Sequence, residues 1–168
     1  MKTAKLIPVL LTTLLAVSAF AQTVGTDVQR DVNQQQRIES GLKSGQLTTH
    51  EAAKLEREES NIDRVQAKAL KDGKLSDAEK ARIAKMQDKA SRDITAEKHD
   101  AQTGNPDSAS SKRMQADVQR NVNQQKRIEK GVQSGELTNK EAGKLEGGQA
   151  RVDRKEARAG AEDRKSVV

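Results

Sequence analysis

The segment DVQRDVNQQQRIESGLKSGQLTTHEAAKLE, residues 27–56, decides the fold because the chain carries it twice. Residues 117–146 read DVQRNVNQQKRIEKGVQSGELTNKEAGKLE, which is identical to the first segment at 21 of 30 positions. A long match at a fixed offset, here 90 residues, indicates that one structural unit has been duplicated. We therefore expect the chain to contain two related modules.

The apolar residues of the first copy have the spacing of an α-helix. They fall within about one third of a helical wheel, which is the width of a stripe that faces a core: Val28, Val32, Ile38 and Leu42. This pattern predicts a first helix over about residues 27–43. A break at Ser44 and Gly45 ends it, and a second helix is expected to continue to about residue 71.

Two capping boxes mark the starts of the helices that follow. In this motif a Ser or Thr side chain accepts from the backbone three residues later, and a Glu at that later position accepts in return. Thr48 with Glu51 predicts the start of the second helix, and Ser76 with Glu79 predicts the start of a third. Because short loops make neighbouring helices antiparallel, residues 22–100 are predicted to form a module of three helices.

The segment AQTGNPDSASSK, residues 101–112, separates the two copies. It is rich in Gly, Ser, Asn and Pro and lacks apolar periodicity, so it is predicted to be a flexible linker. Residues 113–168 then repeat the first helix and its turn, with Thr138 and Glu141 as the capping box.

The end of the second copy departs from the first. Gly147 and Gly148 are expected to interrupt its second helix, and few large apolar residues follow them, so no third helix is predicted. We expect this copy to be a helical hairpin with a frayed, charged end. The predicted fold class is therefore all-α without a sheet, an antiparallel helical hairpin or three-helix unit plus a second, partial copy.

Residues 1–21 have the organisation of a signal peptide. Lys2 and Lys5 precede the apolar run 6–17, and the small residues around Ala21 form a cleavage site. The run is shorter than the roughly 20 residues that cross a bilayer. We expect the protein to be periplasmic or secreted and soluble after removal of the signal peptide at Ala21, with no integral membrane segment afterwards.

Composition limits how this chain can form a core. It contains no Cys, which excludes disulfides, and its single aromatic residue, Phe20, lies in the expected signal peptide. Only 22 of the 147 residues after position 21 are Leu, Ile or Val, below the roughly one fifth typical of chains that fold. The interior is therefore expected to consist of Leu, Ile, Val, Met and Ala alone, and the protein to be marginally stable.

The charge pattern argues against nucleic acid as a partner. After position 21 the 29 Lys and Arg residues alternate with 25 Asp and Glu residues, which is typical of solvated helix surfaces. No aromatic side chain is available there to stack on bases. We expect the partner to be another protein or a second copy of this chain.

The turn between the predicted helices resembles half of a calcium-binding EF-hand loop. If Gly45 takes the sixth position of such a loop, Ser40, Leu42 and Ser44 fall where oxygen ligands are required. When Gly135 or Gly73 is placed at the sixth position instead, the loop again lacks the required set of oxygen ligands. The Gly-x-Leu-Thr-x-x-Glu pattern is better explained as a helix end, a tight turn and a capped helix start. Only Asp72 and Glu79 are weak candidates for metal ligands.

Two segments of the chain resemble a known group of proteins. The segments QRIESGLKSGQLTTHEAAKLERE and LKDGKLSDAEKARIAKMQDKASRDI resemble a group of uncharacterised exported proteins of proteobacteria that carry such duplicated helix-turn-helix units after a signal peptide, with loops like degenerate EF-hands. The resemblance covers most of the chain after position 21. It implies an exported helical protein and no particular activity, ligand or site residue.

The composition lacks most of the residues that enzymes use for catalysis. Without Cys there is no thiol nucleophile, and His50 and His99 stand 49 residues apart, too far in sequence for a zinc motif. Both histidines are predicted to be solvated. We therefore expect no enzyme activity, no catalytic residue and no cofactor.

Three functional hypotheses follow from the sequence. The first is a non-catalytic exported protein that acts as a periplasmic interaction or stress-associated binding module. The second is a chaperone-like binder of unfolded chains in the periplasm, suggested by the long amphipathic hairpins. The third is weak binding of calcium or another cation through the degenerate EF-hand-like loops.

Overall fold

The computed structural model describes residues 16–162, and this part of the chain is helical without any strand. The predicted all-α fold is therefore confirmed. A single 3-10 turn, η1 (Leu70–Asp72), separates the second and third helices. The α-helices are α1 (Ala16–Ser44), α2 (Thr49–Ala69), α3 (Asp77–Lys98), α4 (Ala109–Ser134) and α5 (Asn139–Glu162).

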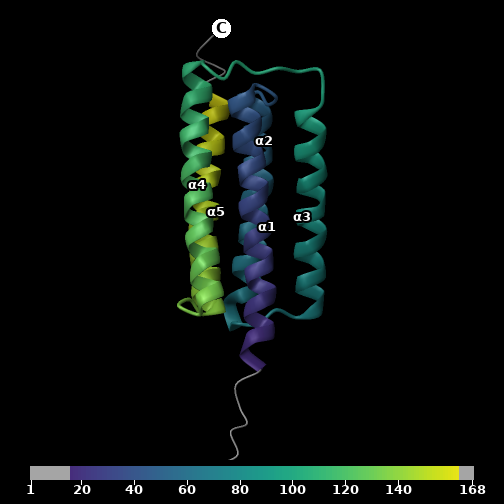
Figure 1. Ribbon diagram of the computed structural model, residues 1–168, viewed down its shortest axis with the longest axis vertical. Coiled ribbons are helices and arrows are strands. Elements are labelled where there is room, and N and C mark those ends of the chain that lie inside the picture. Colours follow the sequence, from purple (N-terminus) through teal and green to yellow (C-terminus); the bar gives the residue numbers. More distant parts are fainter. Residues whose placement is uncertain (1–15, 163–168) are drawn as a thin grey trace, which may run out of the picture.

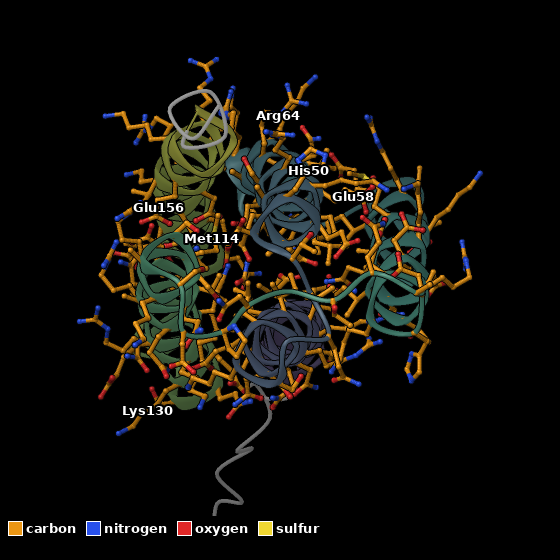
Figure 2. All side chains as sticks on the ribbon, turned by 90° about the horizontal axis from the view of Figure 1, so that it is seen from above. His50, Glu58, Arg64, Met114, Lys130 and Glu156 are labelled. Atoms are coloured by element: carbon orange, nitrogen blue, oxygen red, sulfur yellow. The ribbon has the colours of Figure 1, made fainter. Side chains whose placement is uncertain are left out.

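Four of the helices form an antiparallel bundle. Seen along its axis, α1, α2, α5 and α4 stand at the corners, and α3 lies outside them beside α1 and α2 (Figure 2). The chain runs alternately up and down through the helices, in the order α1 to α5 (Figure 1). The closest helix pairs are α1 with α4 and α2 with α5, so each helix of one copy packs along its own duplicate.

The same turn joins the helices within each copy. Gly45 and Gly135 have φ angles of 74° and 76°, a left-handed conformation that Gly adopts without steric cost. Both capping boxes then form, because the backbone N–H of Thr48 donates to Glu51 at 2.8 Å and that of Thr138 donates to Glu141 at 2.9 Å. The third box forms as well, at Ser76 and Glu79. These local predictions are confirmed.

Several predicted boundaries are wrong. Helix α1 begins at Ala16, well before residue 27, so it overlaps the expected signal peptide, of which residues 1–15 lie outside the described residues. Helix α4 begins at Ala109, so the last four residues of the expected linker 101–112 are helical. Within that segment the backbone N–H of Gly104 donates to the Gly45 carbonyl at 2.9 Å, which ties the connection to the first turn.

The predicted break at Gly147 and Gly148 does not occur. Helix α5 continues through both glycines to Glu162. A glycine inside a helix costs only about 1 kcal/mol, which packing can offset. At Gly147 an added Cβ would lie 3.2 Å from the Ala67 Cβ, so the absence of a side chain lets α5 approach α2 closely.

The interior is not purely aliphatic, contrary to the expectation from composition. Two apolar clusters occupy the two ends of the bundle, and each combines residues of both copies. One cluster contains Ile38, Leu42, Leu47, Ala52, Ala53, Leu55, Ile94, Met114, Val118 and Val122. The other contains Val24, Val28, Ala69, Leu70, Leu75, Ile83, Ile128, Val132 and Ala142. Buried carboxylates and amides fill the middle of the bundle between them.

Within residues 16–162 no helix combines the length and the apolar character that crossing a membrane would require. The expectation that no membrane segment follows residue 21 agrees with this finding for the described residues.

Candidate metal centre

Six acidic side chains are buried in the middle of the bundle, and we refer to them as the carboxylate core. Each is at most 1% exposed, and none of the Lys and Arg side chains that the structure describes is buried. Helix α1 contributes one of these residues, α2 contributes three and α5 contributes two. They are Asp31, Glu56, Glu59, Asp63, Glu146 and Asp153.

The duplication explains how so many carboxylates come together. Glu56 and Glu146 are equivalent residues of the two copies, and so are Asp63 and Asp153. Because α2 packs antiparallel along α5, Glu56 of the first copy lies near Asp153 of the second, and Asp63 lies near Glu146, so the two pairs come together across the bundle. The equivalent glutamines of α1 and α4 then make equivalent hydrogen bonds, at 3.3 Å from Gln35 to Glu56 and at 3.0 Å from Gln125 to Glu146.

Three carboxylates from three helices converge most closely. Oxygen atoms of Asp31, Asp63 and Glu146 all lie within 4.8 Å of one another. This spacing allows one cation to contact all three groups at the 2.3 to 2.6 Å that calcium adopts with oxygen ligands. Asp63 Oδ2 and Glu146 Oε1 are buried and no amide or hydroxyl group donates to them, while the two carboxyl groups lie close enough to share a proton, whose place an ion could take.

Amide side chains hold these carboxylates in place. Gln66 Nε2 donates to Asp31 Oδ2 at 2.7 Å, and Gln87 Nε2, which comes from α3, donates to Asp31 Oδ1 at 2.7 Å. Gln125 Nε2 donates to Glu146 Oε2 at 3.0 Å and to Asp63 Oδ1 at 3.3 Å. Hydrogen bonds to ligand carboxylates are the usual way in which a protein orients a metal site.

Glu59 adds a fourth carboxylate without any fixed partner. It is 1% exposed, and neither of its carboxylate oxygens accepts a hydrogen bond. Burial, followed by the negative charges of Asp31 and Glu56, raises the pKa of Glu59 well above its ordinary value. A buried carboxylate that is neither hydrogen-bonded nor paired with a base costs several kcal/mol, so this position favours a proton or a cation.

The equivalent position on the other side of the core is built differently. There Asn121 replaces Asp31, and its Nδ2 donates to Glu56 Oε2 at 3.1 Å. Gln149 replaces Glu59, and its Nε2 donates to Asp153 Oδ1 at 2.6 Å and to Asn121 Oδ1 at 2.7 Å. Amides thus replace two acids in this half of the core, although Glu56 Oε1 and Asp153 Oδ2 still accept no hydrogen bond there. The half around Asp31 instead holds four carboxylates, and Glu59 has no hydrogen-bond partner at all.

The remaining carboxylates also resist ionisation. Burial is the main cause that raises the pKa of Glu56 and Glu146 to about 8 and the pKa of Asp31 and Asp153 to about 7. Burial also raises the pKa of Asp63 well above its ordinary value, and the neighbouring Glu146 adds to the effect. Near neutral pH these groups therefore exchange protons readily, and a cation can take the place of the protons.

The residues singled out from the sequence lie elsewhere. Asp72 is exposed and accepts from the Lys74 backbone N–H at 3.0 Å, while Glu79 closes the capping box with Ser76, whose hydrogen bonds lower the pKa of Glu79. Among the described residues neither belongs to a group of three converging carboxylates.

Both histidines are exposed, as the sequence predicts. His99 Nδ1 lies 2.8 Å from the Thr95 carbonyl at the end of α3. His50 stands on the outer side of the bundle in the view along its axis (Figure 2). The carboxylate core consequently offers oxygen ligands only.

A second group of carboxylates, Glu51, Glu97 and Asp100, also converges, at the end of the bundle. It differs from the carboxylate core because its charge is already compensated. Lys54 pairs with Glu97 at 2.6 Å, and Glu51 accepts two hydrogen bonds from Thr48 in the capping box. We do not regard this group as a candidate site.

The carboxylate core leaves a signal in the sequence, although none of its residues was among the predicted sites. Asp31 and Gln35 lie on the same helix face as Val28 and Leu42, so they occupy core positions of the helical pattern. Glu56 and Asp63 lie two turns apart on one face of α2, and both recur unchanged in the second copy. Acidic residues in register with an apolar stripe and preserved in both copies indicate a polar interior.

Comparisons with protein-family models, with curated proteins and with solved structures return no match to this chain.

Proposed function

We propose that this protein binds a hard metal cation inside its helical bundle, at the carboxylate core, and that this binding is its function. The observation that carries the proposal is a set of six buried carboxylates among which no Lys or Arg side chain of the described residues is buried. Buried carboxylates are retained in proteins when they pair with a base or bind a metal. Here the base is missing, which leaves protons or a metal as the compensating charge.

The ligand atoms define the class of cation. Carboxylate and amide oxygens suit Ca²⁺ and Mn²⁺, whereas Zn²⁺ and Cu²⁺ prefer sites with His or Cys. Mg²⁺ retains several of its water molecules and is rarely enclosed by protein ligands alone. The core residues are at most 1% exposed, so a bound ion would be almost completely surrounded by protein. We therefore expect selectivity for Ca²⁺ or Mn²⁺.

The enclosure also favours binding over catalysis. A catalytic metal keeps a coordination position open for water or substrate, and a substrate cannot reach side chains that are this deeply buried. The proposed role is to hold the ion and to stabilise the bundle with it. If residues 1–21 are removed as a signal peptide, the ion would be taken up in the periplasm or outside the cell.

The proposed cation site is therefore the carboxylate core and not the EF-hand-like loops. In the loops the glutamates Glu51, Glu79 and Glu141 accept hydrogen bonds as parts of capping boxes, which explains their spacing without an ion. In the core Asp31, Asp63 and Glu146 come from three helices, which no loop motif could predict.

Isothermal titration calorimetry of chelator-treated protein at pH 7.5 tests the proposal. Ca²⁺ or Mn²⁺ should bind with a dissociation constant below 1 mM and should raise the melting temperature, and Mg²⁺ should bind at least tenfold more weakly. Asp63→Asn should weaken Ca²⁺ binding at least tenfold. Glu136→Gln, a change at an exposed position, is the matched control and should leave the affinity unchanged.

The failure of Asp63→Asn to bind the ion must be separated from a failure to fold. Because burial raises the pKa of Asp63 well above its ordinary value, Asn replaces a group that is costly to ionise, and the ion-free variant should melt at or above the temperature of the ion-free wild-type protein at pH 7.5. The proposal is overturned if neither Ca²⁺ nor Mn²⁺ binds the wild-type protein, or if Asp63→Asn binds them as tightly.

A further inference from the structure

The two copies differ in what covers their outer faces. Helix α3 packs against α1 and α2 on one side of the bundle. The opposite side, formed by α4 and α5, has no covering helix in the described part of the chain (Figure 1). Since α4 and α5 are the duplicates of α1 and α2, the first copy shows which kind of element this face is built to bind.

The contacts of α3 define that element. Its apolar side chains Ile83, Ala90 and Ile94 are buried, and they occupy the first, eighth and twelfth positions of a helical stripe. Ile94 belongs to the same apolar cluster as Leu55 of α2, and Leu55 and Ile62, two turns apart on α2, are each only 1% exposed.

Three basic residues of the first copy fasten the polar edges of α3. Arg30 pairs with Asp88, and Lys54 pairs with Glu97 at 2.6 Å. Arg37 Nη2 donates to Thr95 Oγ1 at 2.6 Å and to the Ser91 carbonyl at 3.1 Å.

The second copy keeps the apolar part of this surface but leaves it open. Leu145 is the equivalent of Leu55 and is 46% exposed, and Val152 is the equivalent of Ile62 and is 38% exposed. They are the large hydrophobic residues that the structure records as exposed among the described side chains. Both lie on α5, two turns apart.

The second copy also keeps all three basic residues. Arg120, Arg127 and Lys144 are the equivalents of Arg30, Arg37 and Lys54, and all three are exposed. Arg120 pairs with Asp117 and with Glu156 at 3.0 Å, so its charge is partly used. Arg127 and Lys144 form no ion pair with the described residues, so this edge has a positive charge that a partner can neutralise.

We propose that the face of α4 and α5 binds an amphipathic helix of another protein, one with the chemistry of α3. That helix would place aliphatic residues on Leu145 and Val152 and carboxylates opposite Arg127 and Lys144. Recognition of an amphipathic helix by an apolar strip with charged edges is a recurring mode of protein association. This inference is independent of the cation site, because none of these four residues belongs to the carboxylate core.

A second copy of the chain is a less suitable partner. The apolar side of its α3 is already buried on its own α1 and α2, where Ile83 and Ile94 are completely covered. Only residues 73–76 connect η1 to α3, and the longer connection after it, residues 99–108, is held to the first turn by the hydrogen bond from the Gly104 N–H to the Gly45 carbonyl. A helix from a different protein has no such competing contact.

The test uses a labelled synthetic peptide of residues 77–98 as the probe, with fluorescence anisotropy as the readout and the full chain as the titrant. Saturable binding with one peptide per chain is expected. Leu145→Asp should weaken the binding at least tenfold, and so should the double change Arg127→Glu with Lys144→Glu. Lys126→Glu, at an exposed position about 100° around α4 from Arg127, is the control for charge and should have little effect.

A charge exchange distinguishes specific docking from general attraction. A peptide carrying Asp88→Lys and Glu97→Lys should bind poorly to the wild-type chain and should regain affinity for the Arg127→Glu, Lys144→Glu chain. Circular dichroism of each variant verifies that the bundle remains folded, as expected for changes at exposed positions. The absence of binding, or binding that Leu145→Asp leaves unchanged, overturns the proposal.

Discussion

Asp31 and Asn121 occupy equivalent positions on two helices that pack against each other, yet they make opposite kinds of contact. The Asp31 carboxylate lies within 4.8 Å of oxygens of Asp63 and Glu146, whereas Asn121 donates a hydrogen bond to Glu56. Two differences between the copies, Asp31 against Asn121 and Glu59 against Gln149, thus concentrate negative charge in one half of the carboxylate core. The other half has amide donors in their place, although Glu56 Oε1 and Asp153 Oδ2 accept no hydrogen bond there.

This asymmetry predicts that the core binds one ion tightly and that Asn121→Asp creates a second position. The substitution removes the donor to Glu56 and adds a carboxylate next to it. In the ion-free protein at pH 7.5 it should lower the free energy of unfolding by about 1 to 3 kcal/mol, because a buried acceptor loses its donor. Calorimetry with Ca²⁺ should show the stoichiometry rising from one to two. Asn123→Asp, at an exposed position of the same helix, should change neither quantity.

The raised pKa values predict an unusual dependence of stability on pH. Above about pH 4 the folded protein retains protons that the unfolded chain has already released, on Asp31 and Asp153 up to about pH 7 and on Glu56 and Glu146 up to about pH 8. The free energy of unfolding of the ion-free protein should therefore fall as the pH rises through this interval, by up to about 1.4 kcal/mol per pH unit for each such group.

Urea unfolding in the presence of a chelator at pH 5, 6.5 and 8 measures this dependence. Glu56→Gln should reduce the slope, because it removes one of the groups that release a proton. Added Ca²⁺ should stabilise the protein more at pH 8 than at pH 6, because at pH 6 the ion must displace protons from the buried carboxylates. Stability of the ion-free protein that increases from pH 5 to pH 8 would contradict the assignment of these groups as buried acids.

Two glycines of α5 should respond to alanine in opposite directions. At Gly148 an added Cβ meets no atom within 4 Å, so Gly148→Ala should raise the free energy of unfolding by up to about 1 kcal/mol through helix propensity. At Gly143 the new Cβ would lie 2.7 Å from the Leu70 Cβ, so Gly143→Ala should destabilise the protein by about 1 to 3 kcal/mol. Thermal melting of both variants is the measurement. A lower melting temperature for Gly143→Ala together with a higher one for Gly148→Ala would show that close packing of α5 on α2, and not helix propensity alone, decides the effect.

The duplicated turns provide a matched pair for the glycines with positive φ. Gly45→Ala and Gly135→Ala impose the same backbone strain, of about 1 kcal/mol. At Gly45, however, the new Cβ would also lie 2.9 Å from the Gly104 carbonyl oxygen, while at Gly135 it meets nothing within 4 Å. Gly45→Ala should therefore lower the melting temperature more than Gly135→Ala. Equal effects would show that the contact between the first turn and the connection before α4 is not maintained in solution.

The local parts of this fold could be predicted from the sequence because they depend on neighbouring residues. The pairs Thr48 with Glu51 and Thr138 with Glu141 form hydrogen bonds across three residues, and the glycine before each pair sets the turn. The helical class follows from the same short-range rules. The prediction was wrong at Gly147 and Gly148. The low helix propensity of glycine argued for a break there, but the packing of α5 on α2 maintains the helix.

The sequence by itself determined an all-helical chain with two copies of one capped hairpin, since capping, periodicity and turn geometry act over a few residues. Only the tertiary structure decided that the copies pack together, α1 on α4 and α2 on α5, and so place Asp31, Asp63 and Glu146 around one point. Glu146 is 115 residues from Asp31 in the chain, so the helical pattern can indicate a polar interior but not which of its acids converge. The desolvation that distinguishes a buried acid from a solvated one exists only after the helices have packed.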